Sequence, residues 1–252
     1  MTRSAVVVAH PDDEALWLSS VLGSADRIVL CFGDLFARPR MSAARRRAVA
    51  VLPLPGLIDL KIPESGGGLT VDWARPRPNE AGIALADPAA GERYAANFLV
   101  LVEALRTALA GCTAVYTHNP WGEYGHADHI QVHRAVATLQ GELGYTMWFS
   151  NYVGRASWRL AQDLAAQPLW TERRTVAPDV NLAHTLKRVY RSQGAWTWTR
   201  WHRWPNEESL YAMPPGELVD TRHAFDGERL LHVAGLRWWP PPWERARRVL
   251  RP

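Results

Sequence analysis

The sequence has few cysteines, no long apolar run and no internal repeat. Its two cysteines, Cys31 and Cys112, form neither a disulfide framework nor a Cys-x-x-Cys zinc motif. Each adjoins an apolar run, so we expect both to be small buried side chains. The apolar run near the N-terminus is too short for a signal peptide, and no stretch is long enough to span a membrane. These absences predict a cytoplasmic protein with no membrane span.

Length and charge set broad bounds on the protein. The 252 residues suit one domain with a full core, or one domain with a large appendage. The net charge is +4 and the sequence pI is about 9.3, in a chain where arginine far outnumbers lysine. We attribute this mild excess to arginine-rich codon usage in preference to an anionic partner.

Short strand-like runs alternate with helical stretches over the first 150 residues. We expect strands at residues 5–9, 27–32, 57–62, 113–117 and 145–149. We expect helices at 14–22, 43–52 (with Ser42 as its N-cap), 92–110 and from 126 or 128 to 139. The stretch between the third strand and the 92–110 helix is rich in glycine and proline and is expected to form a long loop over the C-terminal edge of the sheet. This alternation predicts parallel βαβ units and therefore an α/β fold.

After residue 150 the pattern is weaker. We expect a helix at 181–191 and a hairpin formed by 217–221 and 229–233, closing on Asp226-Gly227. Seven of the thirteen tryptophans fall between Trp196 and Trp243. We favour a packed Trp-rich extension, with a wall that stacks on a sugar ring or a surface for single-stranded nucleic acid as the alternatives.

The first cluster of chemically active side chains is Ala9-His10-Pro11-Asp12-Asp13-Glu14, between the first strand and the next helix. In open α/β sheets, ligands bind beyond the C-terminal ends of the strands, which is where this segment is expected to lie. Imidazole and carboxylate are side-chain types that bind metal ions, and the segment has a carboxylate left over for acid–base chemistry. Taken alone, the segment is also typical of a capped helix start, because acidic side chains favour the first turn.

A second cluster, Tyr124-Gly125-His126-Ala127-Asp128-His129, follows the strand expected at 113–117 and opens another helix. Two polar clusters at equivalent positions of two βα units, more than a hundred residues apart, can converge on one metal ion. His129 and His133 share a helix face at a spacing of four residues. The spacing alone does not choose among His126, His129 and His133 as ligands.

Together the two clusters hold a full set of groups for metal-assisted hydrolysis of an amide. Zinc in a catalytic site takes three protein ligands, leaves one position for water or substrate, and lowers the pKa of bound water to about 7. His10, one aspartate and a second histidine can be the ligands. A spare aspartate can take the proton and hand it to a leaving amine. A spare histidine and Tyr124 remain to stabilise the oxyanion.

These motifs resemble the signature of the LmbE-like (PIG-L) metal-dependent N-deacetylases. Members of that family remove acetyl or related acyl groups from glucosamine-containing compounds, including antibiotics during their biosynthesis. The signature is AHPDDE after the first strand and a downstream HPDH-type motif. This chain has AHPDDE at 9–14 and HADH at 126–129, with Ala127 in place of proline. The resemblance covers roughly residues 4 to 150.

The resemblance implies a role for each matching residue of the first motif. His10, Asp13 and His129 would be the ligands of Zn²⁺, or of another divalent ion such as Fe²⁺. Asp12 would be the general base that acts on the metal-bound water.

The second motif is implied to assist the reaction. His126 would stabilise the oxyanion or act as the acid, and Asp128 would hold His126 in orientation. Tyr124 matches a tyrosine that polarises the substrate carbonyl in some family members. His133 lies outside the motif and is expected to be a partly buried helix residue in preference to a ligand.

The chain departs from the family pattern at two points. Ala15-Leu16-Trp17-Leu18-Ser19-Ser20 stands where many members have glycines, and Arg45-Arg46-Arg47 lacks the glutamate of an Arg-x-x-Glu pattern. These departures near the expected sugar pocket predict a specialised substrate, such as one from natural-product metabolism.

We therefore expect an α/β, Rossmann-like fold: a mostly parallel sheet with helices on both faces, plus the Trp-rich C-terminal extension. Residues 1–150 would be the catalytic core, and 151–252 would complete the substrate pocket within one integrated domain. The expected activity is zinc-dependent removal of an N-acetyl or other N-acyl group from an amino sugar or an amino-sugar-containing natural product. The expected partner is that small molecule, such as an antibiotic-type glycoside, and not a nucleic acid.

Three rival functions remain open. The same metal chemistry could act on a non-sugar amide or ester, or the fold could serve a non-catalytic carbohydrate- or natural-product-binding protein. The intact Asp12 favours an enzyme, because a structural zinc site does not need a spare carboxylate. A nucleic-acid binder would lose affinity steeply as salt rises.

Overall fold

The computed structural model describes residues 3–35, 37–68, 70–165, 170–213, 230–233 and 237–238. Its main strands are β1 (Ser4–Val8), β2 (Arg27–Asp34), β3 (Leu57–Pro63), β6 (Ala114–Thr117), β7 (Thr146–Ser150), β9 (Glu172–Val176) and β10 (Glu208–Met213). Its helices are α1 (Asp13–Trp17), α2 (Ser19–Leu22), α3 (Pro39–Val49), α4 (Pro88–Leu109), α5 (Ala127–Leu143), α6 (Trp158–Ala165) and α7 (Val180–Gln193). Short strands form two smaller sheets, β4 (Pro78–Asn79) with β5 (Gly82–Ile83), and β8 (Tyr152–Val153) with β11 (Leu231–His232) and β12 (Arg237–Trp238).

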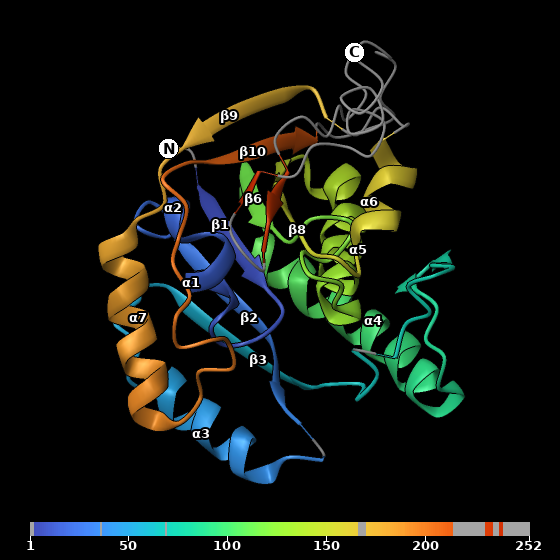
Figure 1. The fold of residues 1–252 in the computed structure, drawn as a ribbon, viewed down its shortest axis with the longest axis horizontal. Helices are drawn as coiled ribbons and strands as arrows, with labels where there is room; N and C mark the ends of the chain where they lie inside the picture. Colours follow the sequence, from blue (N-terminus) through green and yellow to red (C-terminus); the bar gives the residue numbers. More distant parts are fainter. Residues whose placement is uncertain are drawn as a thin grey trace, which may run out of the picture.

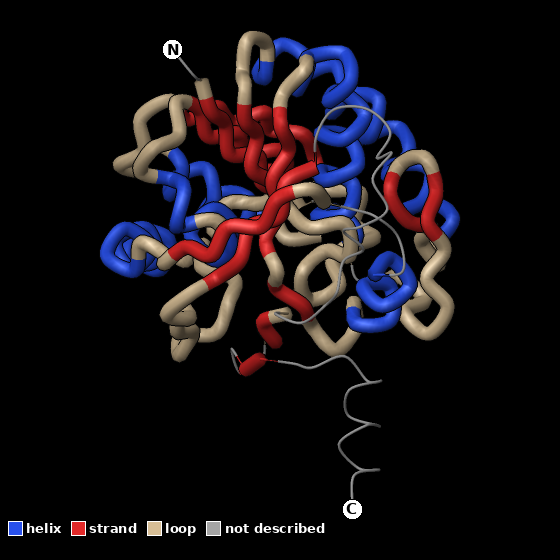
Figure 2. Tube along the Cα trace, turned by 90° about the horizontal axis from the view of Figure 1, so that it is seen from above, coloured by secondary structure: helices blue, strands red, loops and turns tan. Residues whose placement is uncertain are grey.

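The main strands form one sheet that lies between two layers of helices (Figures 1 and 2). The strand order is β3-β2-β1-β6-β7-β10-β9, and the first five strands of this order are parallel. β10 runs antiparallel to both of its neighbours, β7 and β9. Helices α1, α2, α3 and α7 pack on one face, and α4 and α5 on the other. The expected α/β fold with a mostly parallel sheet is confirmed.

β1 lies inside this sheet and is apolar on both sides. Val6 and Val8 belong to the core under α1, α3 and α7, whereas Ala5 and Val7 belong to the core under α4 and α5. Successive side chains of a strand point to opposite faces, so a strand covered on both faces is apolar throughout. This burial fixes the point at which residues 9–14 leave the sheet.

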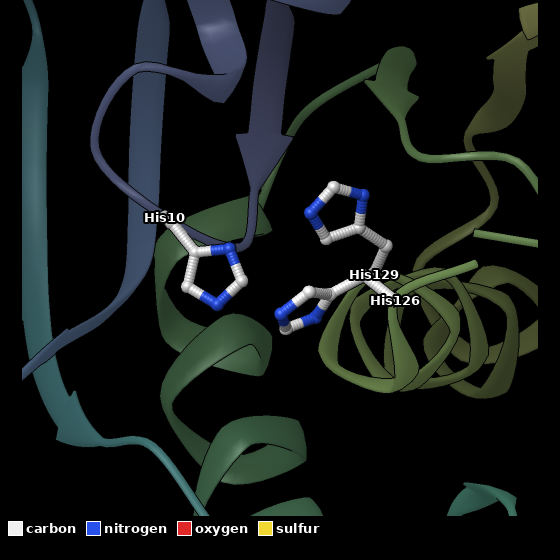
Figure 3. Close-up of side chains that lie close together, drawn as sticks. All are labelled: His10, His126 and His129. Carbon is white, nitrogen blue, oxygen red and sulfur yellow. The ribbon is translucent and has the colours of Figure 1, made fainter. Parts of the chain in front are cut away.

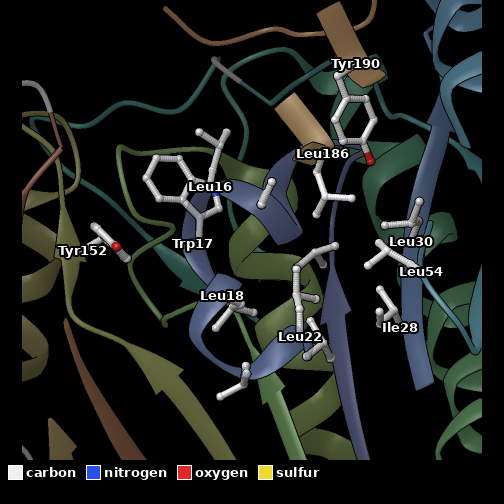
Figure 4. Close-up of a cluster of buried hydrophobic side chains, with 14 of the residues drawn as sticks. Leu16, Trp17, Leu18, Leu22, Ile28, Leu30, Leu54, Tyr152, Leu186 and Tyr190 are labelled. Carbon is white, nitrogen blue, oxygen red and sulfur yellow. The ribbon is translucent and has the colours of Figure 1, made fainter. Parts of the chain in front are cut away.

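The segment after β1 differs from the single helix expected at 14–22. It forms α1 and α2, with Leu18 between them at φ −139°. Residues 11–19 are all buried, and Leu186 and Tyr190 of α7 reach the cluster around α1 (Figure 4). Because the whole segment is interior, it has no half-exposed apolar stripe from which its helical extent could be predicted.

Two helix starts also differ from expectation. α3 begins at Pro39, and Ser42 lies inside it, with its hydroxyl bonded to the preceding loop. α4 begins at Pro88, and the Asp87 carboxylate caps it by accepting a hydrogen bond from the Ala89 N–H at 3.0 Å. Proline favours the first helical position because its missing N–H is not needed there. The Asp-Pro pair was therefore the signal for the start of α4.

Some expectations fall partly or wholly outside the described residues. Most of the expected hairpin and the last two tryptophans, Trp239 and Trp243, lie there, whereas residues 231–232 pair with β8 and β12. The Trp-rich extension and the division of the chain at residue 150 stay predictions. Both cysteines are buried and unpaired, as expected. In the described part of the chain, no helix combines the length and the apolar character needed to cross a membrane.

One buried carboxyl group links the stability of this fold to pH. Glu208, at the start of β10, is 2% exposed and accepts hydrogen bonds from the Tyr152 hydroxyl at 2.6 Å and from the Ser20 hydroxyl. Burial raises the pKa of Glu208 from 4.5 to about 7, although the two hydrogen bonds oppose the rise. Between these values the folded chain keeps a proton that the unfolded chain has released, so stability falls as pH rises.

We expect this group alone to lower the free energy of unfolding by roughly 2 kcal/mol between about pH 5 and pH 8. Glu208→Gln is neutral throughout this range and should lack that part of the decline. Urea unfolding of both proteins at the two pH values measures the difference. An equal decline in the wild type and the variant would contradict the assignment.

Candidate active site

The two sequence motifs meet because the strands that precede them are neighbours. β1 pairs in parallel with β6, so residues 9–14 and 118–129 leave the sheet at the same edge. The His10 ring, from the loop after β1, lies 4.7 Å from the His126 ring and 5.4 Å from the His129 ring, measured between ring centres. Figure 3 shows the three rings close together, with His126 and His129 at the start of α5.

Asp13, a member of the first motif, contacts a histidine of each motif. Its Oδ2 atom is 3.1 Å from His10 Nδ1 and 3.2 Å from His129 Nε2. Its Oδ1 atom accepts a hydrogen bond from the Trp17 indole at 3.0 Å. This second contact fixes the carboxylate, because Trp17 is fully buried one turn further along α1.

His129 is oriented by Glu123, which was not among the predicted site residues. Glu123 Oε2 is 2.6 Å from His129 Nδ1 and 3.0 Å from Nδ1 of His118, and all three side chains are fully buried. His118 Nε2 accepts a hydrogen bond from the Ala9 N–H at 2.9 Å. The second nitrogen of His129, Nε2, is thereby directed toward Asp13.

Asp128 contacts His10 more closely than it contacts His126. Asp128 Oδ2 is 3.2 Å from His10 Nε2 but 4.0 Å from His126 Nδ1. His126 Nδ1 instead accepts a hydrogen bond from the backbone N–H of Asp128 at 3.3 Å, which caps α5. The proton of a neutral His126 ring is therefore on Nε2.

The buried carboxylates of this cluster favour positive charge on the histidines beside them. Burial by itself lowers the pKa of His10, but Glu64, Asp128 and Asp13 together raise it to about 10. Burial likewise lowers the pKa of His129, and contacts with Asp13 and Glu123 raise it to about 9. The buried carboxylates thus outweigh burial, and the cluster favours a cation at its centre.

The donor atoms fit a divalent metal ion. Among the described residues, three overlapping groups bring their donor atoms within 4.8 Å of one another: His10 with His126 and His129, Asp13 with His118 and His129, and His10 with Glu64 and Asp128. Within the described residues, Asp128 Oδ1 is buried without a hydrogen bond, and His129 Nε2 is buried without a hydrogen bond of good geometry, although Asp13 Oδ2 lies 3.2 Å away. Buried polar atoms without a partner are costly, so a bound cation beside them would account for the arrangement.

Asp12 lies beside this cluster in an unusual backbone conformation. Its φ is 99°, a left-handed value that few residues other than glycine adopt. Its side chain is 1% exposed, and its Oδ2 atom accepts hydrogen bonds from the backbone N–H and the hydroxyl of Thr197 at 2.7 and 2.8 Å. Burial and the Asp13 charge raise the pKa of Asp12 to about 7, and the Thr197 hydrogen bonds oppose the rise.

A cavity of about 910 Å³ opens onto the cluster. His10, Asp12 and Asp13 line one part of it. The remaining wall comes from the loop before α3, α3 itself, the loop after β3, the first turns of α4, the loop before α5 and the segment after α7. Its members include Leu35, Met41, Arg45, Gly68, Tyr124 and Trp198. The cavity therefore extends well beyond the groups that could hold a metal.

The loop after β3 closes one side of the site. A Cβ atom on Gly68 would lie 2.2 Å from His126 Cε1, so only glycine fits beside that ring. The Gly68 carbonyl also accepts a hydrogen bond from the Ala127 N–H at 2.9 Å. On the same loop, Glu64 is paired with Arg45 of α3 at 2.5 Å.

All seven residues expected in the site lie at this edge of the sheet, and four further residues join them. These are Glu64, His118, Glu123 and Thr197. His118 directly follows β6, so the rule that ligands bind at strand ends could have found it. His133 is not in any of the three donor groups found in the described residues. Its Nδ1 atom is bonded to the His118 carbonyl at 2.7 Å.

No protein-family model and no curated protein sequence matches the chain. Solved structures do match its fold. A complex of a deacetylase with teicoplanin, from the teicoplanin biosynthesis pathway, is 14% identical and covers 86% of this chain and 100% of its own, with a TM-score of 0.56. The zinc-inhibited form of teicoplanin deacetylase is 13% identical and covers 84% of this chain and 97% of its own, with a TM-score of 0.55. The resemblance expected from the two motifs is thus confirmed at the level of the fold.

We expect the purified protein to bind about one divalent ion per chain, with His129 required for it. His129→Ala should lose the ion, because it removes the nitrogen that faces Asp13. His133→Ala, one helical turn further along α5, is the matched control and should keep the ion. Plasma mass spectrometry after dialysis against Zn²⁺ measures both. Equal metal content in the two variants would place the ion elsewhere.

Proposed function

We propose that the chain is a zinc-dependent N-deacetylase that acts on an amino-sugar-containing compound. One observation carries this proposal. The buried carboxylate of Asp12 lies beside a cluster of histidines and aspartates that could bind a cation, and both face a large cavity. The fold shared with deacetylases supports the same reaction class.

We assign His10, Asp13 and His129 as the metal ligands. Asp13 Oδ2 is in contact with both histidines, and among the described residues His129 Nε2 has no hydrogen-bond partner besides this contact. His118 is a poor alternative, because each of its nitrogens already has a partner. Glu64 is also a poor alternative, because its Oε1 atom already forms an ion pair with Arg45.

A divalent ion held by these ligands would supply the positive charge that makes water nucleophilic at neutral pH. Asp12 takes the proton from the attacking water and later delivers a proton to the departing amine. It suits both tasks, because burial and Asp13 raise its pKa toward neutrality. The products are the free amine of the sugar and a carboxylate.

His126 and Tyr124 act on the acyl oxygen. Burial and the neighbouring His10 keep the pKa of His126 well below its ordinary value, so the ring is neutral. With Nδ1 occupied by the Asp128 N–H, Nε2 carries the proton and donates it to the developing oxyanion. Burial keeps the pKa of Tyr124 above its ordinary value, so its hydroxyl is protonated and can polarise the carbonyl. Asp128 orients His126 through its backbone and His10 through its carboxylate.

The cavity favours a substrate larger than a monosaccharide. Its volume is about 910 Å³, which is at the upper end of the range of about 300–1,000 Å³ for small-molecule sites. Leu35, Met41 and Trp198 offer apolar surface for an aglycone, and Arg38 and Arg93 offer hydrogen-bond donors at the rim. We therefore propose an N-acylated amino-sugar glycoside, and the match to a teicoplanin deacetylase supports this class.

We expect the zinc-loaded protein to release amine from N-acetylglucosamine glycosides with an apolar aglycone, and more slowly from N-acetylglucosamine itself. Asp12→Asn should lower kcat by roughly 10²–10⁴-fold while keeping the metal, because it removes the proton acceptor and none of the ligands. An amine-reactive fluorescent probe measures turnover, and plasma mass spectrometry measures metal content.

Each other outcome has a clear meaning. Amine release from N-acyl amino acids but not from sugars would move the function to a non-sugar amide. Stoichiometric zinc and tight glycoside binding with no release of amine would indicate a binding protein. Full activity in Asp12→Asn would overturn the role of Asp12.

A further inference from the structure

The segment between α7 and β10 reaches the candidate active site from the far end of the sequence. We call residues 195–204 the strap. In Figure 1 this part of the chain, drawn in orange, passes α1 on its way from α7 to β10. Two of its residues, Thr197 and Trp198, line the cavity that opens onto the metal-binding groups.

The strap makes two hydrogen bonds to one oxygen atom of Asp12. The Thr197 N–H donates to Asp12 Oδ2 at 2.7 Å, and the Thr197 hydroxyl donates to the same atom at 2.8 Å. No hydrogen bond to Oδ1 is found within the described residues. Both donors come from one residue, 185 positions away in the sequence. Oδ2 is thus committed to the strap, and Oδ1 is the oxygen left to face a reactant.

The backbone of Asp12 is held from a second direction. Its N–H donates to Glu14 Oε2 at 3.1 Å, and Glu14 Oε1 accepts a hydrogen bond from the Tyr190 hydroxyl at 2.8 Å. Glu14 and Tyr190 are fully buried. A residue other than glycine keeps a φ of 99° only where several contacts hold its backbone in place. Here α7 holds the main chain of Asp12 and the strap holds its carboxylate.

The strap has anchors that do not involve the Thr197 side chain. The Trp204 indole donates to the Ala15 carbonyl at 2.7 Å. The Trp198 ring lies 5.4 Å from Trp17 and 4.9 Å from Tyr124, between ring centres. The Thr197 hydroxyl can therefore be removed without releasing the strap, and its backbone N–H would remain on Asp12.

We propose that Thr197 is the positioning residue for the general base. Its two hydrogen bonds fix the rotation of the Asp12 carboxylate, so that Oδ1 meets the attacking water in one orientation. This inference rests on the proposed role of Asp12 as the base. The Thr197 hydroxyl is committed to Asp12, so its loss acts on the chemical step more than on binding, although Thr197 also lines the cavity.

Three variants test this assignment. Thr197→Val keeps the shape of the side chain and removes its hydroxyl, whereas Thr197→Ser keeps the hydroxyl. Thr199→Val is the matched control, because Thr199 lies on the same strap and its hydroxyl accepts a hydrogen bond from the Trp201 N–H, away from Asp12. For each, kcat and KM on the best N-acylated glycoside, zinc content and thermal midpoint are measured.

We expect Thr197→Val to lower kcat roughly tenfold or more, with KM within about twofold and zinc content unchanged. Thr197→Ser should return kcat to within about threefold of the wild type, and Thr199→Val should match the wild type. A rise in KM with kcat unchanged, or no recovery in Thr197→Ser, would overturn the positioning role.

A structural readout separates this inference from the proposed function. In crystal structures of the zinc-loaded proteins, the Asp12 carboxylate should have one orientation in the wild type and in Thr197→Ser. In Thr197→Val it should have two orientations or a rotated one. One unchanged orientation in all three would overturn the positioning role. If the wild type releases no amine but the carboxylate still rotates in Thr197→Val, the proposed function fails and the geometric part of this inference stands.

Discussion

The structure depends on negative charge that is buried where β1 and β6 end. Asp12, Asp13 and Asp128 are each no more than 3% exposed, and Glu64 adds a further carboxylate next to His10. A buried charge costs several kcal/mol unless it is paired and hydrogen-bonded. The histidines meet part of this demand, which is why the pKa of His10 is raised despite burial. A divalent cation meets it better, because it interacts with several carboxylates at once.

Two layers of supporting contacts keep this charge in place. Beneath the cluster, Glu123 fixes His129 and His118, and His118 is in turn fixed by the backbone of Ala9. On the side of α1, Thr197 of the strap holds Asp12, and Tyr190 of α7 holds its neighbour Glu14. The C-terminal third of the chain therefore contributes to the site as directly as the motifs do. Glu123, His118, Glu14 and Tyr190 are not among the residues that line the cavity, so a substitution at any of them would act on the site from behind.

The sequence predicted the fold and the meeting of the two motifs at one edge of the sheet, because both follow local rules. Apolar runs of strand length preceded His10 and Tyr124, and parallel strands bring their C-terminal ends to one edge. The contacts with Thr197 and Glu64 could not be predicted, since they depend on how distant segments pack. α1 and α2 were expected as one helix because periodicity assumes a half-exposed face, which a fully buried segment lacks. Two further features could have been predicted. His118 directly follows β6, where ligands bind, and the Asp87-Pro88 pair marks the start of α4.

The measurement that tests the central claim most directly is an anomalous difference map at the zinc edge from crystals of the zinc-loaded protein. The account predicts one peak per chain at about 2.0–2.3 Å from donor atoms of His10, Asp13 and His129, with Asp12 beside it but not bound to it. A peak held by His118 or by Glu64, or the absence of any peak at this edge of the sheet, would contradict it.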